Sequence, residues 1–399
     1  MREKITFKDK LSYLLKIMEG KFTPFLQNEL NDDEIKKVFL GLQNRTDVND
    51  YQKLLHNYLN KYYEFEKDIY LTNSGRDALY FILLNLKLKK KEIIIPSYSC
   101  LGLIEPILQL KYKPVFIDID HQLNPLFESV KKAINPETSA VIIPHLGGTI
   151  ASDTFKIIEI CKYKKITVIE DCCQAFGLKF KKKPIGTFSD ISFFSSGAGK
   201  PIFTPCGGWI VTKKNKFRNF EMTNLIDEKI QKVYSNYVNF KNKFSNQRFR
   251  IIKSRLIDKF YSVFVKSQKF FYIKMIQDKK HNLSNLSAYM ILNQIEKNEK
   301  NILTRKKIAN IWMKKLKNIN NIEVLNKANS IFNKLYINSN LSNKKSLLLQ
   351  GIELENGYIP LHLRYDFSKF QQVSLTNTER IWRRIYSLPV RPNLNQQII

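Results

Sequence analysis

The chain has 399 residues, 43% of them hydrophobic and 12% aromatic, which is enough apolar side chain to bury one large core or two moderate ones. This composition excludes an intrinsically disordered chain. Lys and Arg number 66 against 36 Asp and Glu, a formal charge of +30, but the lysines are spread along the whole length together with many Asn and Ile. We interpret the charge as a compositional bias rather than as a nucleic-acid-binding surface, since no aromatic-basic RNA motif accompanies it.

The sequence also indicates a compartment. Its five cysteines form no C-x-x-C pair, and its start, "MREKITFKDKLSYLLKIMEG", is too charged to hold the apolar core of a signal peptide. No stretch approaches the roughly 18 consecutive apolar residues that a membrane-spanning helix needs. We therefore expect a cytoplasmic protein.

Short β-branched runs alternate with helical patterns in the first half of the chain. The helical patterns cover 74–86 and 152–165. The runs predicted to be strands are 92–97, 113–120, 139–148, 166–173, 189–195 and 207–212. This alternation predicts an α/β fold with a mainly parallel central sheet flanked by helices. In such sheets ligands bind outside the carboxyl ends of the strands, so polar residues there are the candidates for a site.

The rest of the chain differs in composition from this large α/β domain, which we place at 68–225. We expect an N-terminal helical segment over 1–67, a basic aromatic helical insertion over 226–281, a long connecting helix over 282–310 and a small C-terminal α+β domain over 311–399. An apolar face at helical spacing lies inside the insertion, at Ile257, Phe260, Tyr261, Phe264 and Val265. This helix either packs on its own domain or lies on an anionic membrane surface.

Asp171 is the first candidate for chemistry. It ends the apolar run "ITVIED", so its carboxylate is expected at the carboxyl edge of the sheet, with Gln174 about one helical turn further on. A buried carboxylate needs a positive partner, which is either a basic residue of the same chain or part of a ligand.

Lys200 is the second candidate, because it lies among small residues in "FFSSGAGKPIFTPCGG". A lysine whose pKa is lowered by such surroundings forms imines with aldehydes. If the aldehyde is pyridoxal phosphate, Asp171 can hold the proton of the ring nitrogen. The turn "NSGRDAL" then offers the backbone N–H groups of Gly75 and Arg76 to the phosphate, and Ser195 adds a hydroxyl.

These motifs together resemble a known family. The succession "NSGRDAL", "PSYSC", "VFIDID", "IIPHLGG", "IEDCCQAFG" and "FFSSGAGK" followed by "GGWIVT" is similar to the DegT/StrS-type sugar aminotransferases, which are fold type I pyridoxal phosphate enzymes. The resemblance runs from about residue 50 onward, except for a stretch at about 226–279. Its most specific part is "EDxxQAFG" with the downstream lysine and "GG".

The resemblance implies roles for individual residues. Lys200 falls on the Schiff-base lysine, Asp171 on the acid that pairs with the pyridine nitrogen, and Gln174 on a residue that contacts the ring face or the phenolic oxygen. Ser195 falls on the phosphate-binding serine, and Gly75 with Arg76 on the phosphate turn. Family members that dehydrate sugars have histidine at the lysine position, so Lys200 favours amino transfer.

The sequence also departs from the family pattern. Arg76 replaces a common threonine and can bind phosphate more strongly or reach a substrate anion. Cys100 stands where an aromatic usually stacks on the cofactor, and Cys206 stands where glutamate is common. The motif that reaches a neighbouring subunit's phosphate is degenerate near Lys280 and Asn282. These departures predict an altered substrate pocket.

Other polar residues have simpler interpretations. His145 follows a strand and either faces the site or is a hydrogen-bonded structural histidine. Asp118 and Asp120 are not expected to form a metal site. Cys172 and Cys173 are expected to be packing residues.

The resemblance implies a homodimeric aminotransferase that transfers an amino group from glutamate to a keto sugar. In this family the keto sugar is nucleotide-activated. Such an enzyme would serve a surface polysaccharide or a glycoconjugate. The competing hypothesis is a non-catalytic relative that acts as a binding or scaffold protein at the membrane surface, motivated by Cys100, Cys206 and the basic segment 226–281. Conversion of the bound cofactor by glutamate would separate the two.

Overall fold

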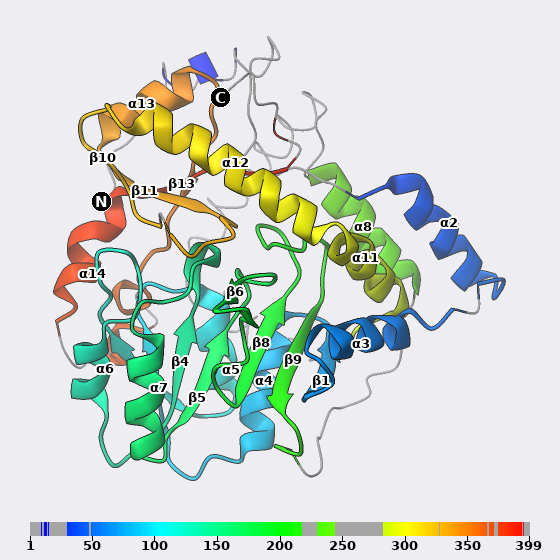
Figure 1. Ribbon diagram of the computed structural model, residues 1–399, viewed down its shortest axis with the longest axis horizontal. Helices are drawn as coiled ribbons and strands as arrows, with labels where there is room; N and C mark the ends of the chain where they lie inside the picture. Colours follow the sequence, from blue (N-terminus) through cyan, green and yellow to red (C-terminus); the bar gives the residue numbers. More distant parts are fainter. Residues whose placement is uncertain are drawn as a thin grey trace.

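The computed structural model describes residues 30–47, 49–217, 230–243, 282–326, 328–364, 367–370, 374–392 and 394, together with 9, 12, 13 and 15. Figure 1 shows a central sheet covered by helices, with a smaller sheet region above the upper ends of its strands. The description below concerns these residues.

The central sheet has seven strands in the order β1-β9-β8-β5-β4-β2-β3. Every neighbouring pair from β8 through β5, β4 and β2 to β3 is parallel, and β9 runs antiparallel to β8 and β1. The strands are β1 (Lys67–Thr72), β2 (Glu92–Pro96), β3 (Lys113–Ile117), β4 (Thr138–Pro144), β5 (Thr167–Asp171), β8 (Ile191–Ser195) and β9 (Gly208–Lys213). The predicted mainly parallel sheet is confirmed.

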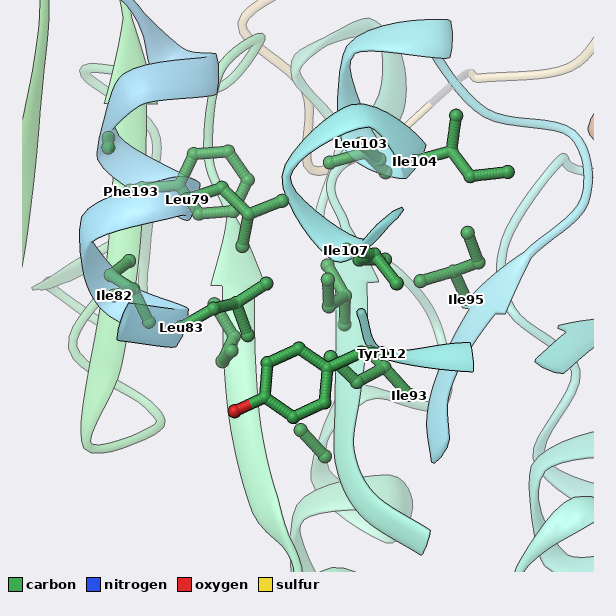
Figure 2. Close-up of a cluster of buried hydrophobic side chains, with 14 of the residues drawn as sticks. Leu79, Ile82, Leu83, Ile93, Ile95, Leu103, Ile104, Ile107, Tyr112 and Phe193 are labelled. Carbon is green, nitrogen blue, oxygen red and sulfur yellow. The ribbon is translucent and has the colours of Figure 1, made fainter. Parts of the chain in front are cut away.

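Helices cover both faces of this sheet. Successive side chains of a strand point to opposite faces, and in these strands the side chains on both faces are apolar. Ile93 and Ile95 of β2 pack under α4 (Gly75–Leu86) and α5 (Ile104–Gln109), where Figure 2 shows them with Leu79 and Ile107. Ile94 points to the opposite face. There it joins the cluster under α6 (Phe127–Ala133) and α7 (Thr154–Tyr163). A two-stranded hairpin, β6 (Lys179–Phe180) and β7 (Lys183–Pro184), follows β5.

A group of helices packs beside β1. It contains α2 (Asp32–Gln43), α3 (Tyr51–Tyr62), α8 (Ile230–Lys243) and α11 (Asn285–Glu296). The predicted long helix after residue 282 is in fact two helices, because the backbone at Lys297 leaves ideal helix geometry (φ −89°, ψ −4°). The second helix, α12 (Asn298–Leu316), runs from this group across to the C-terminal sheet (Figure 1).

The C-terminal region forms the predicted smaller domain. Its antiparallel sheet has the order β10-β11-β13-β12. The strands are β10 (Ile322–Val324), β11 (Leu335–Ser339), β12 (Glu355–Asn356) and β13 (Ile385–Leu388), with helices α13 (Leu341–Leu349) and α14 (Thr376–Ile381). Ile308 and Trp312 of α12 lie in the core of this domain, so α12 connects the group of helices beside β1 to the C-terminal domain.

Most of the expected insertion at 226–281, including the pattern that begins at Ile257, lies outside the described residues. Its described part is α8, where Val233 and Tyr237 are buried against α2 and α11. The Tyr237 hydroxyl donates to Asp32 at 3.0 Å. This part of the segment therefore packs on the protein itself. Among the described helices, none combines the length and the apolar character that a bilayer crossing requires.

Candidate active site

A cavity of about 380 Å³ lies at the carboxyl ends of the central strands. It is lined by Ser74, Gly75, Arg76, Cys100, Leu101, Gly102, Leu103, Glu105, Asp171, Cys173, Phe193, Ser195, Gly197, Ala198 and Lys200. Five of the six predicted site residues are in this lining, and Gln174 is not. The fold therefore brings together residues from four separate connections of the sheet.

One end of the cavity is formed by the first turn of α4. The Ser74 hydroxyl caps this helix by accepting the N–H of Asp77 at 3.1 Å. The N–H groups of Gly75 and Arg76 lie before Asp77, at the positive end of the helix dipole, which favours an anion. A Cβ at Gly75 would lie 2.8 Å from the Cβ of Ser195 and 3.0 Å from the Cys173 sulfur. Only glycine lets the turn and Ser195 come this close.

The Gly75 contact makes a testable prediction. Gly75→Ala should displace the turn or Ser195 at a cost of about 1–3 kcal/mol, which corresponds to a cofactor dissociation constant roughly 10 to 100 times higher. The constant is measured by absorbance titration with pyridoxal phosphate. Gly41→Ala is the matched control, since its Cβ would also lie 2.8 Å from a neighbour, the Cβ of Asp47, far from the cavity. Equal affinity of the Gly75 variant and the parent would contradict the prediction.

Arg76 projects along the cavity wall. Its Nη1 donates to Glu105 Oε2 at 2.9 Å, and its side chain is 48% exposed while that of Glu105 is 1% exposed. Its stem packs on Gly102, where a Cβ would come within 3.1 Å of Cγ. A buried carboxylate thus fixes the guanidinium beside the first turn of α4. Glu105 was missed by sequence reasoning, since a glutamate in a short apolar helix carries no motif.

Asp171 is the last residue of β5 and is 8% exposed. Its Oδ1 accepts the N–H of Cys173 at 3.0 Å, and its carbonyl accepts the N–H of His145 at 3.0 Å. These bonds hold the carboxylate toward the cavity, as predicted from the strand end. The preceding residue, Glu170, points to the other side of the sheet, as strand alternation requires.

Lys200 lies in the loop after β8. Its N–H donates to the carbonyl of Gly197 at 3.1 Å, and Gly199 adopts φ +78°, a conformation that favours glycine. Burial lowers the pKa of Lys200, but the nearby acidic groups of Cys173, Cys100, Asp171 and Glu355 raise it more, so it lies above its ordinary value of 10.5. The expected lowering is wrong, because this pocket surrounds the amine with acidic groups.

Gln174 is buried next to the cavity and held by the C-terminal domain. Its Oε1 accepts the N–H of Gly147 at 2.8 Å and the hydroxyl of Tyr336 at 3.5 Å, and its Nε2 donates to the hydroxyl of Tyr358 at 2.8 Å. Burial raises the pKa of both tyrosines well above the ordinary value, so both remain phenols. Neither tyrosine could be assigned from the sequence, since each lies more than 150 residues from Gln174 along the chain.

The cysteines occupy different surroundings. Cys100 and Cys173 line the cavity. Burial, and next the Asp171 carboxylate, raise the pKa of Cys173 well above its ordinary value, and its sulfur packs against Gly75. Cys172 is buried in the core on the other side. Cys206 is not part of the cavity lining, and its sulfur lies 3.1 Å from the hydroxyl of Ser287 in α11.

His145 is a structural residue rather than a site residue. Its Nδ1 accepts the N–H of Ala151 at 3.2 Å, so Nε2 carries the proton that is shared with Glu170 Oε2 at 3.1 Å. The other oxygen of Glu170 accepts the N–H groups of Phe188 and Ser189. His145, Glu170 and Cys172 lie close enough to hold an ion, but these hydrogen bonds already account for the histidine and the carboxylate.

Asp118 and Asp120 have different hydrogen-bond partners. Asp118 accepts the N–H groups of Asn377 and Thr378 and so caps α14, whereas Asp120 accepts the N–H groups of Gln122 and Asn124 in its own turn. In the segment expected to reach a second subunit, Lys280 lies outside the described residues and Asn282 is half-buried.

The cavity lining has the chemistry that pyridoxal phosphate requires. The amine of Lys200, the carboxylate of Asp171 and the first turn of α4, which favours an anion, all line the same cavity. A single Cβ at Gly75 would fill the space between this turn and Ser195. The aromatic expected to stack on the ring is replaced by Cys100, which does line the cavity.

Comparison with known proteins agrees with this fit. Residues 30–399 match the model of the DegT/DnrJ/EryC1/StrS aminotransferase family. The chain is 26% identical over 392 residues to a GDP-perosamine synthase of Escherichia coli O157:H7, covering 95% of this chain and 96% of the relative. Among solved structures it is similar to Helicobacter pylori PseC, an aminotransferase involved in the biosynthesis of pseudoaminic acid, with a TM-score of 0.70 and 21% identity, covering 94% of this chain and 97% of that one.

NtdA of Bacillus subtilis, solved with bound cofactor PMP, gives a TM-score of 0.64 at 20% identity, covering 98% of this chain and 80% of that one. The fold and site define a pyridoxal phosphate-dependent aminotransferase. The chain belongs to the DegT/DnrJ/EryC1/StrS aminotransferase family.

Proposed function

We propose that this enzyme transfers an amino group from glutamate to the keto carbon of a nucleotide-activated sugar, in the biosynthesis of an amino sugar for a surface polysaccharide or glycoconjugate. The observation that carries the proposal is the single cavity that holds Lys200, Asp171 and the anion-binding start of α4. Family membership and the sugar aminotransferases among the relatives support the sugar as acceptor.

Five residues of the cavity have defined tasks in this proposal. Pyridoxal phosphate supplies an aldehyde for covalent attachment and a ring that withdraws electrons from the reacting carbon. The N–H groups of Gly75 and Arg76 and the Ser195 hydroxyl would bind the phosphate, while Asp171 would hold the proton of the ring nitrogen. Lys200 Nζ would hold the aldehyde and would be the group that carries a proton during amino transfer.

The charges in the cavity support this division of tasks. Asp171 is buried, so its charge is stabilised by a positive partner, and a protonated ring nitrogen provides one. That pairing also neutralises one of the carboxylates that raise the pKa of Lys200. The amine then loses its proton more easily, which is what a nucleophile and general base requires.

Gln174 contacts the cofactor ring or its phenolic oxygen in this proposal. Tyr336 and Tyr358 hold its amide, so the C-terminal domain determines where Gln174 lies. The cavity and the family membership do not favour the hypothesis of a non-catalytic scaffold.

The test of the proposed function is the glutamate half-reaction. The purified protein should bind pyridoxal phosphate with a visible absorption band, and borohydride should fix the cofactor to Lys200, as located by peptide mass. Glutamate should then convert the bound cofactor to its amine form, and a nucleotide-linked 4-keto sugar should restore the original band. A cofactor that no amino donor converts would instead support the scaffold hypothesis.

Arg76 is proposed to bind the cofactor phosphate through its guanidinium, which Glu105 holds at the cavity wall. Arg76→Lys keeps a charge for Glu105 but loses the planar fork, so cofactor affinity should fall about 10-fold, as expected for one charge-assisted hydrogen bond. Cofactor titration and the KM for the keto sugar are measured together. A raised KM with unchanged cofactor affinity would assign Arg76 to a substrate anion, and no change in either would contradict both roles.

We further propose that the enzyme is a cytoplasmic homodimer, as the resemblance to this family implies. Light scattering of the purified protein tests the dimer. Contact with a membrane through 226–281 stays a prediction, because its apolar pattern lies outside the described residues while α8 is packed inward.

A further inference from the structure

Three consecutive carbonyls of the Lys200 loop accept hydrogen bonds from side chains of the C-terminal third of the chain. Asn333 Nδ2 donates to the carbonyl of Gly199 at 2.9 Å. Arg391 Nη1 donates to the carbonyl of Lys200 at 3.1 Å, and Arg305 Nη2 to that of Pro201 at 2.9 Å. We call Asn333, Arg391 and Arg305 the carbonyl clamp.

The members of the carbonyl clamp are almost completely buried. The exposed fraction is 1% for Asn333, 2% for Arg391 and 0% for Arg305. Burying a guanidinium is costly unless it is well bonded, and a hydrogen bond from a charged donor contributes about 1.5–3 kcal/mol. The Arg391 guanidinium also lies over the ring of Phe203, 5.1 Å from its centroid, in the same loop. Two buried cations are thus directed at one short segment of backbone.

The loop around Lys200 is rich in small residues. Near the lysine its internal bonds join Lys200 N–H to the Gly197 carbonyl and Gly197 N–H to the Ile202 carbonyl, and further out the N–H and hydroxyl of Ser196 donate to the carbonyls of Gly207 and Cys206. Glycine leaves the backbone many accessible conformations, so bonds from outside the loop add restraint at the lysine itself. The clamp binds the carbonyl of Lys200 and those on either side, which fixes the two peptide planes that flank its Cα.

The three donors come from separate elements of the C-terminal region. Arg305 lies in α12, Asn333 precedes β11, and Arg391 follows β13. These elements pack around the core that contains Ile308, Leu335 and Val390. The loop after β8 is therefore tied to the second domain at the very residue whose amine enters the cavity.

We propose that Asn333, Arg305 and Arg391 are positioning residues that set the place of the Lys200 amine, so that the C-terminal domain controls how the lysine meets the cofactor aldehyde. This inference rests on the role proposed for Lys200. It assigns a function to residues outside the cavity lining, because they act through the backbone of the lysine.

The test measures the attachment of the cofactor rather than turnover. Asn333→Ala removes one neutral donor and is the milder variant, while Arg391→Met removes a charged donor of similar length. After the bound cofactor has been stripped, pyridoxal phosphate is added and borohydride traps the attached fraction over time. Misplacement of the amine should slow attachment about 10- to 100-fold. The pH at which the visible band of the attached cofactor changes should also shift.

Two control variants separate positioning from loss of stability. Asn343→Ala also removes an amide donor to a carbonyl, that of Asn320 at 2.8 Å, in the same domain but away from the lysine loop. Leu347→Ala opens a cavity in the C-terminal core and lowers the melting temperature without removing a donor. Both should attach the cofactor at the parent rate.

Parent rates and an unchanged band titration in both clamp variants would overturn the inference, as would an equal slowing in Leu347→Ala. Failure of the parent protein to attach the cofactor at all is a different result, which would reject the role proposed for Lys200 itself. Slowing confined to the clamp variants supports the inference.

Discussion

Lys200→Ala should abolish borohydride-stable attachment of the cofactor and lower kcat by about 10³-fold or more. The expectation combines the loss of the nucleophile with the loss of the proton carrier, and general acid–base catalysis alone contributes about 10²–10⁴-fold. Single-turnover absorbance changes with glutamate measure the effect on the amino-donor half-reaction. The phosphate end of the cavity is untouched, so the cofactor should still bind without a covalent bond.

Lys200→Arg is the matched variant, because it keeps a long cationic side chain in the same cavity but forms no imine. It should be as inactive as the alanine variant, which would show that the covalent chemistry of the amine is required and not only its charge. An alanine variant that keeps turnover within 10-fold of the parent would reject Lys200 as the catalytic lysine.

The sequence predicted the central sheet well for a physical reason. Strands buried on both faces are continuous apolar runs, so β2, β4 and β5 are visible as "EIIIP", "TSAVIIP" and "TVIED". The break between α11 and α12 was missed, since residues 296–301 contain no Gly or Pro to mark a helix end and the change of direction depends on tertiary packing. Asn298 and Ile302 pack against Gly177 just after this break.

The candidate site was predictable where it depends on strand ends and tight turns. Asp171, Ser195 and Lys200 follow from their position at the carboxyl edge of the sheet, and Gly75 from the start of a helix. The supporting residues were not predictable. Glu105, Tyr358 and Arg391 act through contacts between distant segments, and isolated residues of these types form no local pattern. The pKa of Lys200 was also misjudged, because its acidic neighbours come from three different parts of the chain.

Asp171→Asn should leave the fold intact while removing most of the catalytic power. The amide oxygen of asparagine can still accept the N–H of Cys173, which Asp171 Oδ1 accepts at 3.0 Å. The substitution removes the electrostatic attraction between the carboxylate and a protonated ring nitrogen. This attraction is about 4 kcal/mol for charges 4 Å apart at an effective dielectric constant of 20. That energy corresponds to roughly 10³-fold in rate, since each 1.36 kcal/mol is tenfold.

The readouts for Asp171→Asn distinguish a catalytic effect from a binding effect. Without its anionic partner the ring nitrogen should lose its proton, so kcat for the glutamate half-reaction should fall far more than cofactor affinity, which depends mainly on the phosphate end of the cavity. Asp118→Asn serves as the control, because Asp118 caps α14 with both oxygens and should affect melting temperature rather than the band of the bound cofactor. If Asp171→Asn reduced kcat less than 10-fold, Asp171 would not be the partner of the ring nitrogen, and its burial at the strand end would need a structural explanation.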